Sequence, residues 1–329
     1  MAGLNLNTEF IIGSITLCIA VFVATLCVFP GRNRAAINWN TLHVLITGAS
    51  HGVGRATAEM LLAKAPGLRL TLIDREPLDP GLMQRWKAIS AASDERIHVY
   101  QHDLADGHCT GGTKAQAASL SSLLNGIIVS HGTPDILINN AGTVAGKFLT
   151  DLTSSDIDST LAINLVAPML LTQLLLPHWI QRDRGHVIHV ASAAGLVGLA
   201  WLTDYCASKF ALVGFHESLR QELRYTNVHT SVICPGHIKT RLFASVRPVL
   251  TWLNPSLTPE QVATTIVRAI ERNRSQDVWL PWFTWNALIV RAVPVWLNDF
   301  GHWVMSANNF WPEDRAPDYC KRGWEPGNN

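Results

Sequence analysis

The chain has 329 residues, enough for one large domain or two ordinary ones, and charged residues make up only 16% of it. Its formal net charge of +1 gives no bulk attraction to nucleic acid, so a nucleic-acid partner is not expected. The six cysteines include no CxxC pair, which argues against zinc and disulfide frameworks and predicts reduced thiols.

The first strong feature along the chain is an uncharged apolar run at residues 10–29, which follows a leader at residues 1–9 without Lys or Arg. As a helix, these twenty residues would rise about 30 Å, which matches the hydrocarbon thickness of a bilayer. A cleaved signal peptide typically has a basic leader and a shorter apolar run. We therefore predict an uncleaved membrane anchor, with a signal peptide and a buried core helix as the alternatives. Arg32 and Arg34 follow it and, by the positive-inside rule, place the downstream chain in the cytoplasm.

After a linker at residues 30–40, strand patterns alternate with helix patterns. The predicted strands are residues 42–46, 68–73, 97–101, 136–138, 187–190 and 230–233. The predicted helices are residues 55–64, 114–129, 155–181 and 204–226, and the glycine-rich residues 106–112 are predicted to form a loop. Because parallel neighbours need crossover helices, this alternation predicts an α/β fold, a doubly wound parallel (Rossmann) sheet in a single catalytic domain at residues 41–245.

The sequence TGASHGVG at residues 47–54 follows the first predicted strand directly and opens a helix. Glycines are needed there for a tight turn, for close approach of the backbone to a phosphate, and for close helix–strand packing. The free N–H groups of the helix N-terminus then face the pyrophosphate of a dinucleotide. We expect cofactor contacts from Gly48, Ser50, His51, Gly52, Val53 and Gly54.

Asp74 ends the second predicted strand, twenty residues beyond Gly54. A carboxylate there can accept hydrogen bonds from both ribose hydroxyls and would repel a 2′-phosphate, so it favours NAD. Arg75, His51 or Arg55 could instead favour that phosphate, so NADP remains an alternative. The other role open to Asp74 is a strand-end cap.

Tyr205 and Lys209 lie four residues apart in a predicted helix, so their side chains share one face. A free tyrosine has a pKa near 10, too high for a base at neutral pH. A lysine ammonium about 4 Å away contributes roughly 4 kcal/mol at an effective dielectric of 20, or about three pKa units. This predicts a phenol able to transfer protons, although chance alone can supply the spacing.

Three further polar features accompany this pair. Ser192 follows the predicted strand at residues 187–190, where its alternative role is a turn residue. Asn139, Asn140, Ala141 and Gly142 follow the strand at residues 136–138. Asn164 interrupts an apolar run inside a long helix, where an amide is unfavourable unless it has a partner.

Taken together, the TGxxxGxG loop, the NNAG motif, the helical Asn, the Ser, the YxxxK pair and Pro235-Gly236 resemble the short-chain dehydrogenase/reductase family over about residues 41–240. The sequence YCASKF at residues 205–210, running into VGFH at residues 213–216 and combined with an N-terminal anchor, is similar to the membrane-anchored 17β-hydroxysteroid dehydrogenase (types 11 and 13) and retinol dehydrogenase group.

The resemblance implies an NAD(P)-dependent enzyme that acts on a CH–OH group, and it implies roles for single residues. Tyr205 would be the acid/base, Ser192 would bind the substrate oxygen, and Lys209 would lower the tyrosine pKa and bind the nicotinamide ribose. Asn164 would hold a water that relays the proton. The remaining implied cofactor contacts are Asp103 and Leu104 at the adenine, Asn139 with Ala141 and Gly142 at the cofactor wall, and Pro235, Gly236, Ile238 and Thr240 near the carboxamide. His237 and Lys239 depart from the usual family pattern of that last loop.

Residues 246–329 are predicted to form a substrate lid and a Trp-rich tail, the lid starting near Leu242. Between residues 278 and 311 the tail carries six tryptophans, and its formal charges are those of Arg291 and Asp299. It would either pack on the core or on a second subunit of a homodimer, or lie in a membrane interface as helices broken near Pro294.

We therefore expect a lipophilic alcohol or ketone as substrate, such as a retinoid, a sterol or a long-chain lipid. The alternatives are an NADPH-dependent ketoreductase and a non-catalytic membrane or lipid-droplet scaffold. The catalytic domain is expected on the cytosolic face of the endoplasmic reticulum or of lipid droplets, and sugar on the sequon at Asn273 would contradict this. No metal is expected, because the histidines (His186, His189, His216 and His229) lack ligand spacing.

Overall fold

The computed structural model describes residues 37–90, 96–243, 255–281, 284 and 293–304. The chain divides into two units, Met1–Ile37 and Asn38–Asn329, and the described helices and strands belong to the second. The predicted leader and anchor, most of the predicted lid and much of the tail lie outside the described residues.

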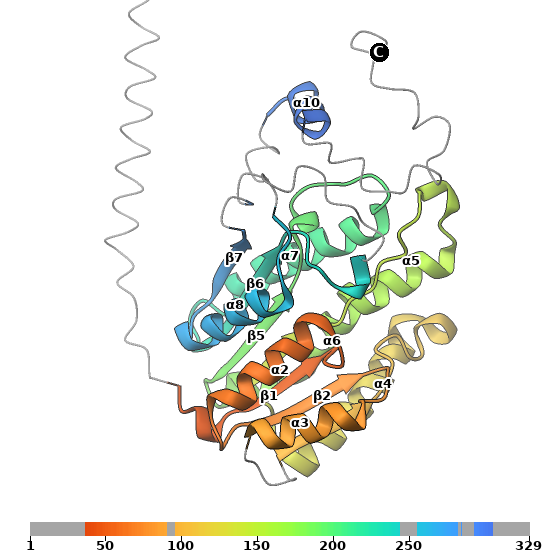
Figure 1. Ribbon diagram of the computed structural model, residues 1–329. Coiled ribbons are helices and arrows are strands. Elements are labelled where there is room, and N and C mark those ends of the chain that lie inside the picture. The colour runs from red at the N-terminus through yellow and green to blue at the C-terminus, as the bar shows by residue number, and fades with distance from the viewer. Residues whose placement is uncertain (1–36, 91–95, 244–254, 282–283, 285–292, 305–329) are drawn as a thin grey trace, which may run out of the picture. The chain divides into compact units, whose positions relative to one another are not determined.

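A seven-stranded parallel sheet forms the centre of the second unit, with strand order β3-β2-β1-β4-β5-β6-β7 (Figure 1). The strands are β1 (His43–Thr47), β2 (Arg69–Asp74), β3 (Ile97–Gln101), β4 (Ile136–Asn139), β5 (Gly185–Val190), β6 (Val228–Pro235) and β7 (Gln276–Leu280). Every residue of β1, β4 and β5 is buried, as expected for parallel strands covered on both faces. The order reverses between β1 and β4, and ligands bind beyond the carboxyl ends of strands at such a point.

Two layers of helices cover the sheet. In one layer, α2 (Gly52–Lys64) packs against α3 (Pro80–Ser90) and α8 (Pro259–Arg272), which Figure 1 shows in front of the strands. In the other, α4 (His108–His131) packs against α6 (Ala167–Gln181), and α5 (Ser154–Leu161) packs against α7 (Thr203–Glu222). Apolar side chains of the sheet and of α6 share one buried cluster, which forms the core on this face of the sheet.

The predicted α/β architecture is confirmed, and the predicted strands and helices match observed ones within a few residues. Residues 106–112, predicted as a loop, instead hold the start of α4, and Gly112 interrupts that helix with φ +62°. The sequence did not predict α3, α8 or β7. Because α8 packs on α2 and β7 pairs with β6, the sheet domain continues beyond residue 245 to Leu280.

Within the described part of the chain, one helix is long and apolar enough to cross a membrane, the continuous stretch Ser154–Gln181. Half of its apolar window is buried, and Leu171, Leu175 and Trp179 belong to the core cluster beneath the sheet. We therefore interpret this stretch as a core helix of the domain. It is a different segment from the predicted anchor at residues 10–29, which lies outside the described residues.

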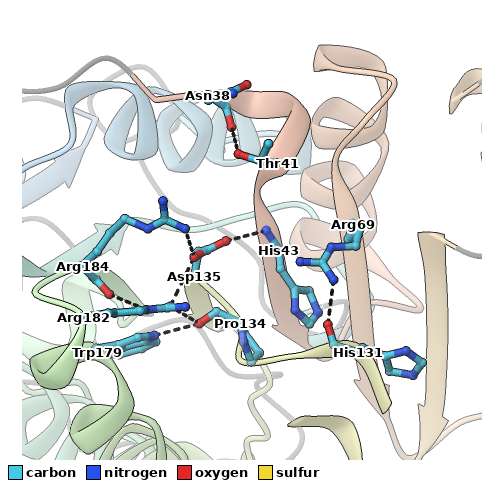
Figure 2. A network of polar contacts seen from close by, with 10 residues as sticks. All are labelled: Asn38, Thr41, His43, Arg69, His131, Pro134, Asp135, Trp179, Arg182 and Arg184. Carbon is cyan, nitrogen blue, oxygen red and sulfur yellow. Dashed lines mark hydrogen bonds and ion pairs between the residues drawn. The ribbon is translucent and has the colours of Figure 1, made fainter. Parts of the chain in front are cut away.

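The amino edge of the sheet carries a network of polar contacts around Asp135, which precedes β4 (Figure 2). Its buried carboxylate accepts a hydrogen bond from the His43 backbone amide (2.9 Å) and pairs with Arg184 (2.5 Å) and Arg182 (3.3 Å). The carbonyl of Pro134 accepts hydrogen bonds from Arg182 and from the Trp179 indole, each at 2.8 Å. This network joins the starts of β1, β4 and β5.

Candidate active site

A cavity of about 520 Å³ opens at the carboxyl edge of the sheet, beside the point where the strand order reverses. Most of the predicted site residues line it, although they are spread over nearly two hundred positions of the chain. Those that do are Gly48, His51, Gly52, Val53, Asp74, Arg75, Asp103, Leu104, Ala141, Gly142, Ser192, Tyr205, Lys209, Pro235, Gly236, Ile238 and Thr240. Four predicted site residues do not line the cavity and make their contacts outside it: Ser50, Gly54, Asn139 and Asn164.

The glycine loop fits a phosphate because side chains are excluded from it. Gly48 has φ +69°, and a Cβ there would lie 2.8 Å from the Cα of Ala141. A Cβ on Gly54 would overlap the carbonyl oxygen of Gly48, so α2 can approach β1 this closely only with glycine. His51, the N-cap of α2, makes no side-chain capping hydrogen bond, which leaves the amides of the first turn for an anion.

Asn140 holds this loop in place. Its side-chain amide donates hydrogen bonds to the carbonyls of Thr47 (3.0 Å) and Gly48 (2.9 Å). The Thr47 hydroxyl in turn accepts from the backbone amides of Asn140 and Ala141, each at 3.1 Å. The NNAG motif therefore fastens the end of β4 to the start of the cofactor loop.

Asn139 was expected at the cofactor wall, and the structure corrects this. It is the last residue of β4 and lies in the core, where its amide contacts His189 (3.2 Å) and Thr172 (3.5 Å). Asn140 follows the end of β4, and from there to Thr143 each residue lines the cavity.

Asp74 lies at the end of the cavity where β2 ends, and it binds two backbone amides. One carboxylate oxygen accepts from Ser50 (2.8 Å), and the other accepts from Glu76 (3.1 Å). The alternative role of Asp74, a strand-end cap, is therefore present, and the carboxylate also positions the glycine loop. Each oxygen keeps a second lone pair, so the carboxylate can still accept from ribose hydroxyls.

Ser192, Tyr205 and Lys209 meet where β5 ends beside α7. Tyr205 and Lys209 are one helical turn apart, and the lysine Nζ lies 5.7 Å from the centre of the tyrosine ring. The ammonium donates to the carbonyl of Val190 (2.9 Å), the last residue of β5. All three side chains are buried.

Burial shifts the pKa values of Tyr205 and Lys209. It raises the pKa of Tyr205 well above its ordinary value, and a hydrogen bond with the Ser192 side chain acts in the opposite direction. Burial also lowers the pKa of Lys209 to about 8. The phenol pKa therefore moves in the direction opposite to the one expected from Lys209, because removal from water is the largest influence on it.

Asn164 occupies a one-turn π-helical segment, Ala162–Val166, between α5 and α6. Its amide nitrogen donates to the Thr143 carbonyl (2.9 Å) and the Ser208 hydroxyl (3.1 Å), and its oxygen accepts from the Thr143 amide (2.8 Å). Ser208 in turn donates to the carbonyl of Tyr205 (2.7 Å). The unfavourable mid-helix amide thus has its partners, and it couples the loop after β4 to the turn that carries Tyr205. π-Turns inside α-helices are frequent at functional sites.

Apolar and aromatic side chains pack around Tyr205. Phe243 approaches its ring edge-on, with centroids 5.6 Å apart. Phe148, Trp201 and Leu202 belong to the same buried cluster. Trp201 has φ +71°, an unusual conformation for a side chain of this size, and its indole lies against Gly146.

The sequence did not single out several of the residues that line the cavity. These are Ile73, Glu76, His102, Thr143, Ile163, Val190, Ala191 and Arg241. Asn140 and Lys239 were named without a cofactor role, and Leu242, Phe243 and Pro259 fall in the predicted lid. Nothing in the local pattern predicted Arg241, because its position depends on how the loop after β6 folds back.

The histidines in the core have protein partners. His186 bonds the Ser231 hydroxyl (2.8 Å), and His216 contacts Thr230 (2.8 Å) and the carboxylate of Asp277 (2.7 Å). Among the residues that the structure describes, no group of three or more His, Cys, Asp or Glu side chains is placed to hold a metal ion.

Comparison with known proteins agrees with this geometry. The model of the short chain dehydrogenase family matches residues 42–250. The chain belongs to the short-chain dehydrogenase family. Estradiol 17-beta-dehydrogenase 11 from Homo sapiens is 32% identical to this dehydrogenase over 230 residues, covering 69% of this chain and 71% of that protein. Epidermal retinol dehydrogenase 2 from Homo sapiens is 33% identical over 230 residues, covering 69% and 70%.

Among solved structures, 4-hydroxyisoleucine dehydrogenase complexed with NADH superposes with a TM-score of 0.61 at 22% identity, covering 73% of this chain and 98% of that one. This likeness supports the fold alone. Membership of the family makes the protein an NAD(P)-dependent oxidoreductase, so the enzyme class and the nicotinamide cofactor expected from the motifs are confirmed.

Proposed function

We propose that this dehydrogenase interconverts a lipophilic alcohol and its carbonyl compound, with Tyr205 as the group that exchanges the proton. The observation that carries the proposal is the meeting of buried Tyr205, Ser192 and Lys209 in the cavity that the glycine loop also lines. The glycine loop would hold the phosphates. The neighbouring trio would act on the substrate oxygen.

The roles follow from the geometry. When bound, the nicotinamide supplies or accepts the hydride. Because its pKa is raised, the Tyr205 phenol keeps its proton at neutral pH and can donate it to a carbonyl oxygen. The Ser192 hydroxyl, already bonded to that phenol, would hold the same oxygen. Lys209 would hold the nicotinamide ribose, and Asn164 would position the turn of α7 and the relay water.

We propose NAD as the preferred cofactor because Asp74 faces the cavity at the end of β2, where it would bind both ribose hydroxyls. The test compares kcat/KM for NAD and NADP in the wild type and in Asp74→Ala. The variant should lose about tenfold with NAD and gain with NADP. Asp74→Asn is the control, because it keeps an acceptor for the Ser50 amide while removing the charge.

A lipophilic substrate is supported by the aromatic wall beside Tyr205, where Phe243, Phe148 and Trp201 offer little to a polar ligand. Two relatives carry the names of estradiol and retinol dehydrogenases, which is consistent with this chemistry. We propose a sterol, a retinoid or a long-chain lipid alcohol as the substrate class, covered by a lid from residues 246 onward. Turnover of small polar alcohols only would contradict it.

We also propose that the enzyme works at a membrane, on the cytosolic face of the endoplasmic reticulum or of lipid droplets. Residues 10–29 would anchor it, and α10 (Val295–Val304) in the tail adds support. On α10, Val295 is 74% exposed and Trp296 69%, a surface suited to a membrane interface. Protease protection in sealed microsomes tests the topology: digestion of the catalytic domain supports it, and glycosylation at Asn273 would contradict it.

An NADPH-dependent ketoreductase is the second candidate, and one observation favours it. His51, Arg75 and Arg241 line the cavity near its Asp74 end and could attract a 2′-phosphate. A panel of lipid alcohols and ketones assayed with NAD, NADP and their reduced forms separates the two candidates. If the protein bound none of the four cofactors, the non-catalytic scaffold would remain as its function.

A further inference from the structure

The loop after β6 is fixed by backbone pairing before it reaches the cofactor cavity. Ile238 forms a parallel bridge with Leu257, the Lys239 amide donates to the Leu257 carbonyl (2.9 Å), and the Leu257 amide donates to the His237 carbonyl (2.8 Å). Thr240 then packs against the glycine loop, since a Cβ on Gly52 would lie 3.3 Å from its methyl group. The loop therefore meets the N-terminus of α2.

The next residue, Arg241, reaches over that N-terminus. Its Nη1 lies 3.2 Å from Nε2 of His51, the N-cap of α2. Nδ1 of the same imidazole lies 3.6 Å from a carboxylate oxygen of Glu76, in the loop after β2. These three side chains all line the cavity, and together they bridge its two sides above the glycine loop.

A neutral imidazole is a weak partner for a guanidinium compared with a phosphate oxygen, which gives charge-assisted and often bidentate hydrogen bonds. Arg241 is exposed, it offers five N–H donors, and its side chain projects over the helix end where a pyrophosphate binds. We propose that Arg241 is a further cofactor-binding residue, whose guanidinium leaves His51 and binds the pyrophosphate of the dinucleotide. This inference rests on the proposed position of the cofactor.

Direct binding tests it without turnover. The full-length enzyme and Arg241→Met are titrated with NADH and NADPH by fluorescence, and with ADP and adenosine by calorimetry. The variant should bind NADH, NADPH and ADP about tenfold to a hundredfold more weakly, because all three carry the pyrophosphate. Adenosine, which lacks it, should bind equally well to both proteins. Arg241→Lys, which keeps the charge but loses the planar fork, should fall between them.

Arg224→Met is the matched control, since this exposed arginine lies just beyond α7 and its loss changes the net charge equally. It should bind every ligand like the wild type. Without ligand, Arg241→Met should unfold at the wild-type temperature, and only its stabilisation by NADH should shrink. Equal NADH binding by Arg241→Met and wild type would overturn the inference. A loss confined to NADPH would overturn it too, by making Arg241 a reader of the 2′-phosphate. If the wild type bound neither dinucleotide, the proposed function would fail as well.

Discussion

At the amino edge of the sheet, the buried carboxylate of Asp135 meets two arginines and a backbone amide. At the carboxyl edge, the buried ammonium of Lys209 meets the carbonyl of Val190, and no carboxylate stands among the groups that shift its pKa. At the amino edge, the buried negative charge is paired with positive charges. At the carboxyl edge, the pKa values of the Lys209 ammonium and the Tyr205 phenol are moved away from their ordinary range.

This difference separates a structural edge from a reactive one. At the amino edge, paired charges join the starts of three strands. Unbalanced groups cost stability, and they cluster at functional sites because proton transfer needs perturbed groups.

The largest expected effect comes from replacing Lys209, the buried cation at the carboxyl edge. Lys209→Met should lower kcat/KM by about a thousandfold, because in the proposed mechanism both the cofactor ribose and the proton-transferring phenol lose a partner. The same variant should be more stable by about 1–2 kcal/mol at pH 7, since one pKa unit corresponds to about 1.4 kcal/mol and only one hydrogen bond is lost. Urea unfolding measures the gain.

The pH dependence of this gain in stability tests whether it comes from the charge of Lys209. Between pH 8 and 10.5 the folded protein holds fewer protons on Lys209 than the unfolded chain does, so wild-type stability should rise with pH. In Lys209→Met this contribution should be absent. A variant that is less stable than the wild type at every pH would contradict the assignment of Lys209 as an unbalanced charge.

Acid should destabilise the protein through the amino edge of the sheet, where His43 and His186 are buried as neutral rings. Burial lowers the pKa of His43 to about 4 and of His186 to about 3, from 6.5. As the pH falls below 6.5 the unfolded chain gains protons that the fold excludes, so stability should fall. Each ring should contribute a loss of about 2–3 kcal/mol by pH 4.5.

His186→Gln keeps a hydrogen-bonding group near the Ser231 hydroxyl, so it isolates the titration. Urea midpoints of this variant should change less than those of the wild type between pH 7 and pH 4.5. Equal acid sensitivity in the two proteins would mean that another group controls the loss.

A smaller effect should follow from unbalancing the amino edge. Asp135→Ala removes the hydrogen bond to the His43 amide and both ion pairs, and should cost about 2 kcal/mol of unfolding free energy. Arg184→Ala should cost less than about 1 kcal/mol, because its side chain is 65% exposed. Neither variant should change kcat in a steady-state assay. A change in kcat would show that contacts at the amino edge affect the active site at the carboxyl edge.

The residues that could be predicted from the sequence are those whose chemistry is local. The glycine loop, Asp74 and the Tyr205–Lys209 pair depend on spacing within one turn or on a strand end, and the cavity brings them together. The choice of Asn140 over Asn139 required knowing the residue at which β4 ends. Arg241 and Phe243 depend on a loop held by a bridge to Leu257, which no local pattern encodes. β7 was missed because its pattern merges with the Trp-rich tail that follows.

The central claim, that Tyr205 exchanges the proton in this cavity, is tested most directly by Tyr205→Phe. The wild type and the variant are compared for turnover of estradiol, retinol and a long-chain alcohol with NAD, and for NADH affinity. The account predicts a loss of about 10²–10⁴ in kcat with NADH binding unchanged, because the phenol oxygen is removed and the ring remains. A variant that keeps wild-type kcat would contradict the account.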